Sequence, residues 1–278
     1  MFLPVPAIDH VVVNVRDGLD AAAGLYARLG FTLTPRGHHT LGSSNNLAIF
    51  GTDYLELLGV QPGNSRTDVL DWPAGLNGLV FKTLDADATH AALHAAGLPV
   101  LEPQAFSRPV DLPGGGSGDA AFRTVRMDKA AVPAGRLFFC QHLTPQHVWH
   151  PAWQRHANGA LGIARAVVAA DDPAVLGALF TRMFGAGAVR QGAGGCSLLA
   201  GLARVDVVTP AALRVEFGDA APDVSGRTQA MAVLTLRTAS LARTGAALQA
   251  GGVAVAPGPG GLVVPASVLG GMALAFQE

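Results

Sequence analysis

An extended apolar run followed by a short helical pattern occurs four times along the chain. The apolar runs begin near residues 8, 78, 163 and 230, and they predict strands. After each run, the spacing of apolar residues predicts a helix, which a glycine ends. Further β-like sequence completes each copy. This recurring pattern predicts a duplicated scaffold with one helix and several strands in each unit.

The spacing of the helix-ending glycines indicates how the four units are grouped. These glycines are Gly30, Gly97, Gly185 and Gly251, so the intervals between them run short, long and short. Two pairs of units fit this spacing better than four equal repeats. One helix and about four strands cannot enclose a core alone, so the units are expected to pair. The sequence therefore predicts an α+β fold.

A connector rich in Pro, His and Trp separates the two pairs. It covers residues 147–159 and is too aromatic for a flexible linker, so we expect it to pack on the protein surface. The predicted N-terminal domain then covers residues 1–146, and the C-terminal domain covers residues 160–278. The Gly-rich stretch 113–118 lacks the Lys-Ser/Thr of a phosphate loop and opens no helix, so it predicts a hairpin turn or a mobile loop.

Charge and composition exclude several classes of function. The 278 residues carry a formal net charge of −1, so no basic field attracts nucleic acid or an anionic membrane. Mean hydropathy is +0.34, but no uncharged apolar run reaches the ~18 residues that a membrane span needs. Two cysteines give no disulfide framework. We expect a cytoplasmic protein whose partner is a small molecule rather than nucleic acid or a membrane.

Side chains suited to chemistry gather in the first unit. His10 lies in its opening strand, and Glu56 lies in its closing strand. All nine histidines of the chain fall at or before His156, and the later units lack the His/Glu pair. Neutral imidazole and carboxylate oxygen are the usual donors for Zn, Fe, Mn, Ni or Co. One half of the scaffold is therefore expected to keep a polar site.

Three segments of the first half resemble a known superfamily. They are Ile8-Asp9-His10-Val11-Val12, the run from Gly37 to Leu47 with its His, Gly and Asn, and Tyr54-Leu55-Glu56-Leu57. In these motifs the chain resembles the vicinal oxygen chelate superfamily, and more narrowly its glyoxalase-like subgroup. Glyoxalase I, extradiol dioxygenases and fosfomycin-resistance proteins are members of the superfamily. The resemblance implies four βαβββ modules, paired into two glyoxalase-like domains with curved, mostly antiparallel sheets.

The resemblance also implies roles for individual residues. Metal ligands of the superfamily sit on the first and last strands of each module, which points to His10 and Glu56 and, by strand position, to His142. Glu56 is also the candidate catalytic group. His39 and Asn45 are candidate substrate-binding residues at the mouth of the cleft, and His39 competes with His142 as third ligand. Such a site would hold a divalent metal with open positions for two adjacent substrate oxygens.

The chain departs from the superfamily pattern at several ligand positions. Asn77 stands where the second module should open with a His, and the closing strand of that module lacks the usual Glu. In the second half, Arg165 and Asp206 stand where His10 and Glu56 stand in the first. We expect Arg165 and Asp206 to form an ion pair, which leaves that site lapsed. A simpler alternative for the first half is a metal-free hydrogen bond between His10 and Glu56 across the sheet.

Three functional hypotheses follow. The first is an enzyme of lyase, isomerase or dioxygenase type that depends on a divalent metal and acts on a small substrate with vicinal oxygens. The second is a metal-free protein that binds or sequesters a small molecule in the same cleft, as resistance-type members of the superfamily do. The third is a structural or dimerisation role, and the sequence leaves homodimer formation open.

Overall fold

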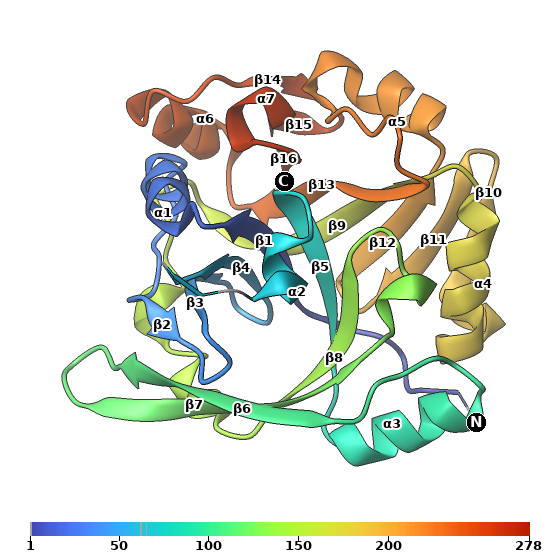
Figure 1. Cartoon of the computed structure of the whole chain (residues 1–278). Coiled ribbons are helices and arrows are strands. Elements are labelled where there is room, and N and C mark those ends of the chain that lie inside the picture. The colour runs from blue at the N-terminus through green and yellow to red at the C-terminus, as the bar shows by residue number, and fades with distance from the viewer. Residues whose placement is uncertain (1, 62, 65) are drawn as a thin grey trace.

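The computed structural model describes residues 2–61, 63–64 and 66–278 (Figure 1). The first half contains β1 (Ile8–Arg16), α1 (Leu19–Arg28), β2 (Gly37–His38), β3 (Ser43–Ile49), β4 (Tyr54–Val60), α2 (Thr67–Leu70), β5 (Gly75–Lys82), α3 (Ala86–Ala95), β6 (Gln104–Asp111), β7 (Ser117–Arg126) and β8 (Arg136–His142). The second half contains β9 (Ala160–Ala170), α4 (Pro173–Phe184), β10 (Val189–Gly192), β11 (Gly195–Ala200), β12 (Ala203–Val208), α5 (Pro210–Phe217), β13 (Gln229–Thr238), α6 (Leu241–Ala250), β14 (Ala256–Gly258), β15 (Gly261–Val264), α7 (Ala266–Leu269) and β16 (Ala273–Gln277).

Each half of the chain forms one eight-stranded sheet. The strand order is β2-β3-β4-β1-β5-β8-β7-β6 in the first sheet and β10-β11-β12-β9-β13-β16-β15-β14 in the second. Within every module the opening strand pairs in parallel with the closing strand, as β1 does with β4. The other strand pairs are antiparallel, for example at the centre of each sheet. The predicted fold of four paired βαβββ modules is confirmed.

Short polar residues cap the starts of several helices, and the predicted glycines follow their ends. The side chains of Asp85, Asp172 and Ser240 accept hydrogen bonds from backbone N–H groups in the first turns of α3, α4 and α6. Gly30 and Gly97 follow α1 and α3 with φ of 86° and 67°. A β-carbon is disfavoured in that left-handed region, so glycine lets the chain turn back toward the sheet there.

A single hydrophobic core joins the two halves. It contains residues of both sheets and of α1, α4 and α6, for example Leu29 and Phe81 from the first half and Phe180 and Phe276 from the second. The helices also meet in pairs, because α1 lies beside α6, and Arg182 of α4 donates to two carbonyl groups at the end of α3 (Figure 1). The two sheets coincide with the two predicted domains. The domain boundaries themselves remain a prediction.

The first sheet curls until its two edge strands meet. The N–H of Thr40, just after β2, donates to the carbonyl oxygen of Ser107 in β6 at 3.0 Å. The hydroxyl of Thr40 accepts from the N–H of Ser107 at 3.4 Å. The hairpin of β6 and β7, which turns in the Gly-rich stretch, runs along the bottom of Figure 1. A sheet that closes in this way covers its own edges and encloses the space on its concave face.

The connector is ordered and packed, as its composition predicted. It follows directly on one short 3₁₀ turn, Pro145–His147, and contains another, Pro151–Trp153, in which the ring of Trp153 is buried. His156 is also buried, with one ring nitrogen 3.1 Å from the N–H of Thr32 and the other 2.9 Å from the carbonyl oxygen of Ile49. The connector therefore anchors itself to the first half. No described helix is long and apolar enough to span a membrane.

Candidate functional site

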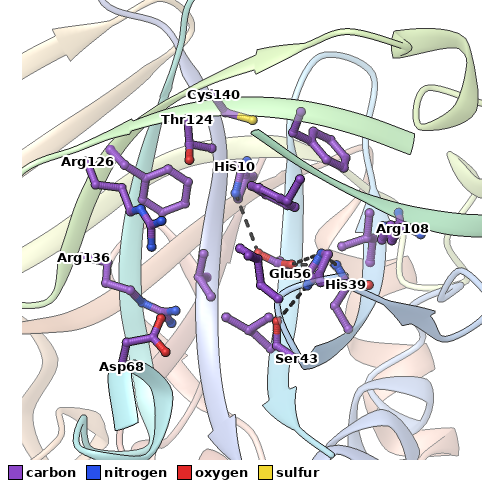
Figure 2. Close-up of a pocket in the computed structure, with 18 of the residues that line it drawn as sticks. His10, His39, Ser43, Glu56, Asp68, Arg108, Thr124, Arg126, Arg136 and Cys140 are labelled. Carbon is purple, nitrogen blue, oxygen red and sulfur yellow. Dashed lines mark hydrogen bonds and ion pairs between the residues drawn. The ribbon is translucent and has the colours of Figure 1, made fainter. Parts of the chain in front are cut away.

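A cavity lies on the concave face of the first sheet (Figure 2). The space that a water-sized sphere can enter is about 80 Å³. Its walls combine an apolar lining with an unusual number of charged side chains. The lining residues are His10, Val12, His39, Leu41, Ser43, Asn45, Leu47, Tyr54, Glu56, Leu58, Arg66, Asp68, Phe106, Arg108, Phe122, Thr124, Arg126, Arg136, Phe138 and Cys140.

Glu56 is the buried carboxylate of this cavity. It alternates along β4 with Tyr54 and Leu58, which line the same wall, because side chains two apart share a face of a strand. Asn45 Nδ2 donates to Glu56 Oε1 at 2.6 Å. Burial alone would raise the pKa of Glu56, but the nearby imidazoles of His10 and His39, the bond from Asn45 and the charge of Arg136 outweigh it and hold that pKa below its ordinary value. Glu56 is therefore ionised at neutral pH.

His10 faces Glu56 without a hydrogen bond between them. The distance from His10 Nε2 to Glu56 Oε2 is 3.7 Å, which is too long for a hydrogen bond. His10 Nδ1 instead lies 2.6 Å from Asp9 Oδ1, and the ring stacks on Tyr54 at 4.3 Å between centroids. The simple His10–Glu56 hydrogen bond expected as an alternative is therefore not what the structure contains.

A β-bulge at Asp9 sets the direction of His10. Ile8 and Val11 belong to the shared core on the outer face of the sheet, whereas His10 lines the cavity. The pairing of β1 with β5 shifts register between Ile8 and His10, so Asp9 is the extra residue. The bulge moves His10 to the concave face, and it places the Asp9 carboxylate beside the ring of His10.

His39 and Asn45 stand together beside Glu56. Asn45 Nδ2 lies 3.2 Å from His39 Nε2, and His39 Nδ1 lies 2.9 Å from the hydroxyl of Ser43. Burial lowers the pKa of His39 to about 4, against the attraction of Glu56, so the imidazole is neutral at neutral pH. Arg66 donates to the Ser43 hydroxyl at 2.9 Å. The structure thus brings three of the predicted site residues, His39, Asn45 and Glu56, into direct contact.

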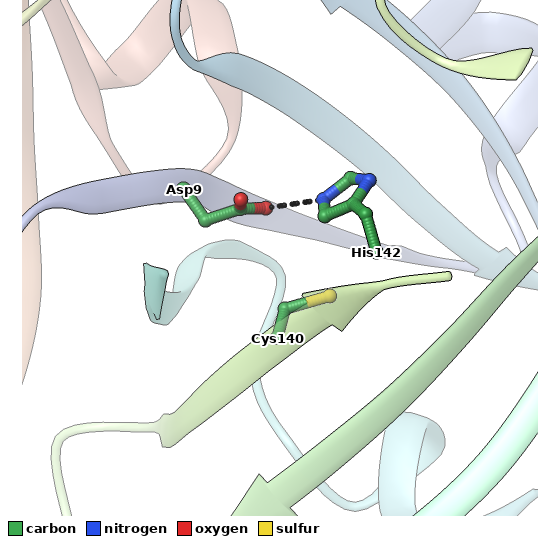
Figure 3. A group of neighbouring side chains, drawn as sticks. All are labelled: Asp9, Cys140 and His142. Atoms are coloured by element: carbon green, nitrogen blue, oxygen red, sulfur yellow. Dashed lines mark hydrogen bonds and ion pairs between the residues drawn. The ribbon is translucent and has the colours of Figure 1, made fainter. Parts of the chain in front are cut away.

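His142 is directed to Asp9 rather than to Glu56. Its Nε2 lies 3.0 Å from Asp9 Oδ1, so the carboxylate of Asp9 sits between two histidine rings. Burial would raise the pKa of Asp9, but the bonds and charges of His10 and His142 hold it well below its ordinary value. Asp9, Cys140 and His142 form a group whose potential ligand atoms lie within 4.8 Å of one another (Figure 3). Burial raises the pKa of the Cys140 thiol, which makes it a poor ligand at neutral pH.

The donors around Glu56 do not complete a metal centre. A 3.7 Å separation of His10 Nε2 and Glu56 Oε2 suits two ligands of one ion, and the Asp9 bond to His10 is a usual support for a metal-binding imidazole. Catalytic sites generally supply three protein ligands. His39 Nε2 lies 4.0 Å from Glu56 Oε1, but His10, His39 and Glu56 do not all bring a donor atom within 4.8 Å of one another. Among the described residues, the group that meets this spacing is Asp9, Cys140 and His142. The metal roles of His10, Glu56 and His142 remain predictions.

Besides Arg66, three further arginines of the cavity were not among the predicted site residues. Arg108 of β6 alternates with Phe106 and Val110, whose side chains are at least partly buried, while Pro109 between them is exposed. Arg126 of β7 and Arg136 of β8 also line the cavity. Burial lowers the pKa of Arg136 to about 10, so it remains charged at neutral pH. The alternation in β6 was the one sequence signal that could have identified Arg108.

In the second half, an ion-pair network replaces the cavity's His/Glu pair. Val167 is the register partner of Asp206, as Val12 is of Glu56, so Arg165 and Asp206 do occupy the positions of His10 and Glu56. Arg165 pairs with Asp206, which confirms the predicted ion pair. It also pairs with Glu216 of α5, a partner that the sequence analysis missed.

The helix α5 itself covers the concave face of the second sheet. Its apolar residues Leu213 and Phe217 pack on inward-facing residues of that sheet such as Val167 and Val233. In Figure 1 this helix lies at the upper right, over the second half. The face that forms a cavity in the first half is thus filled by the chain's own side chains in the second.

Comparison with protein families identifies the class to which this fold and site belong. Residues 8–184 match the model of the glyoxalase-like domain family, which is more than half of the chain. The chain therefore belongs to the glyoxalase-like domain family, and the expected membership of the vicinal oxygen chelate superfamily is confirmed. No curated protein matches the chain.

Solved structures with the same fold cover nearly the whole chain. A hypothetical protein from Staphylococcus aureus has 12% identity and a TM-score of 0.62, with 98% of this chain and 100% of that chain covered. A mutant of 4-hydroxymandelate synthase from Streptomyces coelicolor has 15% identity and a TM-score of 0.58, with 93% of this chain and 78% of that chain covered. A xylose isomerase-like TIM barrel/4-hydroxyphenylpyruvate dioxygenase fusion protein has 15% identity and a TM-score of 0.55, with 92% of this chain and 40% of that chain covered. At such identities the likeness shows the fold alone.

Proposed function

We propose that this protein is an enzyme of isomerase or lyase type in which Glu56 removes a proton from a small carbonyl-containing substrate. The observation that carries the proposal is an ionised, buried carboxylate in the wall of the cavity, with one oxygen held by a hydrogen bond and the other without one. Asn45 holds Glu56 Oε1 at 2.6 Å, and no described residue hydrogen-bonds to Oε2. A fixed carboxylate in an enclosed site is suited to general-base catalysis.

His10 is suited to stabilise Glu56 after that proton has moved. Asp9 accepts from His10 Nδ1–H, and in this tautomer the lone pair of Nε2 faces Glu56 Oε2 at 3.7 Å. While Glu56 is ionised, His10 Nε2 and Glu56 Oε2 are both acceptors, so no hydrogen bond forms between them. Once Glu56 carries the substrate proton, its O–H can donate to His10 Nε2. The interaction therefore strengthens as the proton is transferred, which is the condition for an interaction to accelerate a reaction.

A divalent metal would alter only the way in which the substrate oxygens are held. Such an ion would supply a Lewis acid for vicinal oxygens, and His10 and Glu56 are the donors that would hold it. Because the third donor is not in place, we derive no step through a metal. Metal dependence, the dioxygenase alternative and the roles of His39 and Asn45 in substrate binding remain predictions for the same cavity.

The proposal is tested by following hydrogen exchange at carbon. Small 2-oxo acids and 2-hydroxy ketones would be incubated in D₂O with the protein, and loss of the proton next to the carbonyl would be followed by NMR. We expect exchange with at least one compound, and a decrease of at least about 100-fold in the Glu56→Gln variant. The control is Glu102→Gln, since that carboxylate is exposed and lies near His90 at the surface. Exchange that is equal in wild type and Glu56→Gln would refute the proposal.

A metal-free binding protein is the second candidate, and the walls of the cavity favour it. The rings of Tyr54, Phe106, Phe122 and Phe138 line the same enclosed space as Glu56. Aromatic walls with a few polar groups are typical of sites that bind small molecules tightly. Tight binding of a compound with no exchange or turnover would favour this function over catalysis.

A further inference from the structure

We propose that the cavity binds a small carboxylate with an apolar body, and that Arg108 is the residue that holds the carboxylate group. This names the substrate class of the proposed function, but it rests on that function only for the part played by Glu56. The binding of the anion itself depends on Arg108 and on the shape of the cavity. Figure 2 places Arg108 on the His39 side of Glu56, with Arg126 and Arg136 on the other side.

Arg108 is a buried guanidinium group without a partner. Its side chain belongs to the largest fully buried ones in the protein, with 1% of the residue exposed. None of its three nitrogen atoms has a hydrogen-bond partner among the described residues. Buried charges are normally paired, because removing a charge from water without compensation costs stability. A ligand that brings a negative charge would supply the missing partner.

The fold makes room for this side chain. A β-carbon on Gly37 of β2 would lie 2.6 Å from Asn45 Oδ1 and 2.7 Å from both Cδ and Nη1 of Arg108, so these two side chains occupy the space that the glycine leaves free. The contact between Thr40 and Ser107 brings the two edge strands together at this point. The contact between the two edge strands therefore fixes the position of Arg108, which lines the cavity together with Glu56.

Among the four lining arginines, Arg108 is the one whose three side-chain nitrogen atoms are all buried without a hydrogen-bond partner among the described residues. Arg66 is paired with Asp68. Arg136 donates to the side-chain oxygen of Asn77 at 3.1 Å. The four lining arginines outnumber the two lining carboxylates, Glu56 and Asp68, so the cavity favours an anion.

The chemistry of the walls narrows the class of anion. A single guanidinium fork matches the two oxygens of a planar carboxylate. Around it, the rings of Phe106 and Phe122 stack at 5.3 Å between centroids, and both line the cavity. They offer an apolar surface for the body of the ligand. A carboxylate anchored at Arg108 would place the adjoining carbons in the space toward Glu56.

Binding of phenylacetate and of its neutral amide, phenylacetamide, tests the proposal. Affinities would be measured by calorimetry on wild-type protein and on the variants Arg108→Met, Arg123→Gln and Glu56→Gln. We expect wild type to bind phenylacetate at least about tenfold more tightly than phenylacetamide, because only the carboxylate forms a charge-assisted hydrogen bond with Arg108. Arg108→Met should lose this preference. Arg123→Gln is the matched control, since that arginine pairs with the exposed Asp87 outside the cavity.

The variant Glu56→Gln separates this proposal from the proposed function. Removing the negative charge of Glu56 should leave phenylacetate binding unchanged or tighter, whether or not Glu56 is a catalytic base. Loss of an unpaired buried charge should also make Arg108→Met melt at a higher temperature than wild type. Equal affinity of wild type for the acid and the amide would overturn the proposal, and this comparison needs no variant. Retention of the preference in Arg108→Met would also overturn it.

Discussion

Asp53 is a buried carboxylate at the contact between the two halves, and its replacement by Asn is expected to stabilise the protein. Its Oδ1 accepts the N–H of Ile163 in β9 at 2.9 Å, and the hydroxyl of Thr52 donates to Oδ2 at 3.3 Å. The residue is 4% exposed. Burial raises the pKa of Asp53 from 3.8 to about 6, although the bond from Ile163 and the nearby Arg237 oppose the rise.

The raised pKa of Asp53 determines the size and sign of the expected change in the free energy of unfolding. A folded pKa above the unfolded value means that the folded state binds the proton more tightly. The contribution of Asp53 to stability is therefore present below pH 4 and is lost as the pH rises through 6. A shift of about two units corresponds to about 3 kcal/mol at pH 7.5. Asp53→Asn keeps an oxygen acceptor for Ile163 and cannot ionise, so it removes this cost.

Urea denaturation followed by circular dichroism at several pH values measures the effect. At pH 7.5, Asp53→Asn should raise the free energy of unfolding by up to about 3 kcal/mol, less the cost of burying its amide group. The difference from wild type should shrink as the pH falls from 6.5 to 4.5. Asp87→Asn serves as the exposed control, and it should follow the wild-type curve. A variant that is less stable than wild type at pH 7.5, or whose difference is constant with pH, would refute the reasoning.

Three further predictions concern the cavity and its counterpart in the second half. Because His10, His39 and Glu56 do not all bring a donor atom within 4.8 Å of one another, mass spectrometry of purified protein should find well below one equivalent of transition metal. One equivalent of metal, lost in His10→Ala, would instead establish the metal site. Arg165→Met should lower the free energy of unfolding by about 1–3 kcal/mol, since it removes the shared partner of Asp206 and Glu216 while Arg204 and Ser197 still bond Asp206. Glu216→Gln should cost clearly less, and equal effects would contradict the network. Gly37→Ala should displace Asn45 and Arg108, destabilise the fold by about 1–3 kcal/mol and weaken carboxylate binding in calorimetry, and unchanged binding would show that the arginine does not need this space.

Much of the fold could be predicted because its signals are local. The strand and helix periods repeat in every module, and residues such as Gly30, Asp85 and Ser240 mark helix ends through contacts within a few positions. The pairing of modules followed from the spacing of glycines. The positions of Arg165 and Asp206 in the second half could also be aligned with those of His10 and Glu56, because parallel pairing conserves register.

The site was harder to predict because its decisive contacts are distant in the sequence. The bulge at Asp9 leaves no mark in the local pattern, yet it brings that carboxylate between His10 and His142. Arg108 enters the cavity only because two edge strands meet, a contact between residues 40 and 107. Glu216 reaches Arg165 from a helix outside the repeated modules. In each case tertiary geometry determines the contact, and no local propensity specifies it.

The shared core has a consequence for how the protein depends on its own concentration. The outer face of the first sheet packs against the second half, through contacts such as Leu29 and Phe81 with the core that includes Phe180 and Phe276. A two-module chain would have to cover such a surface with another copy of itself, and dilution would then expose it. Here the covering partner is tethered through the packed connector, so its effective concentration is fixed by the chain. The internal pairing is therefore expected to survive any dilution.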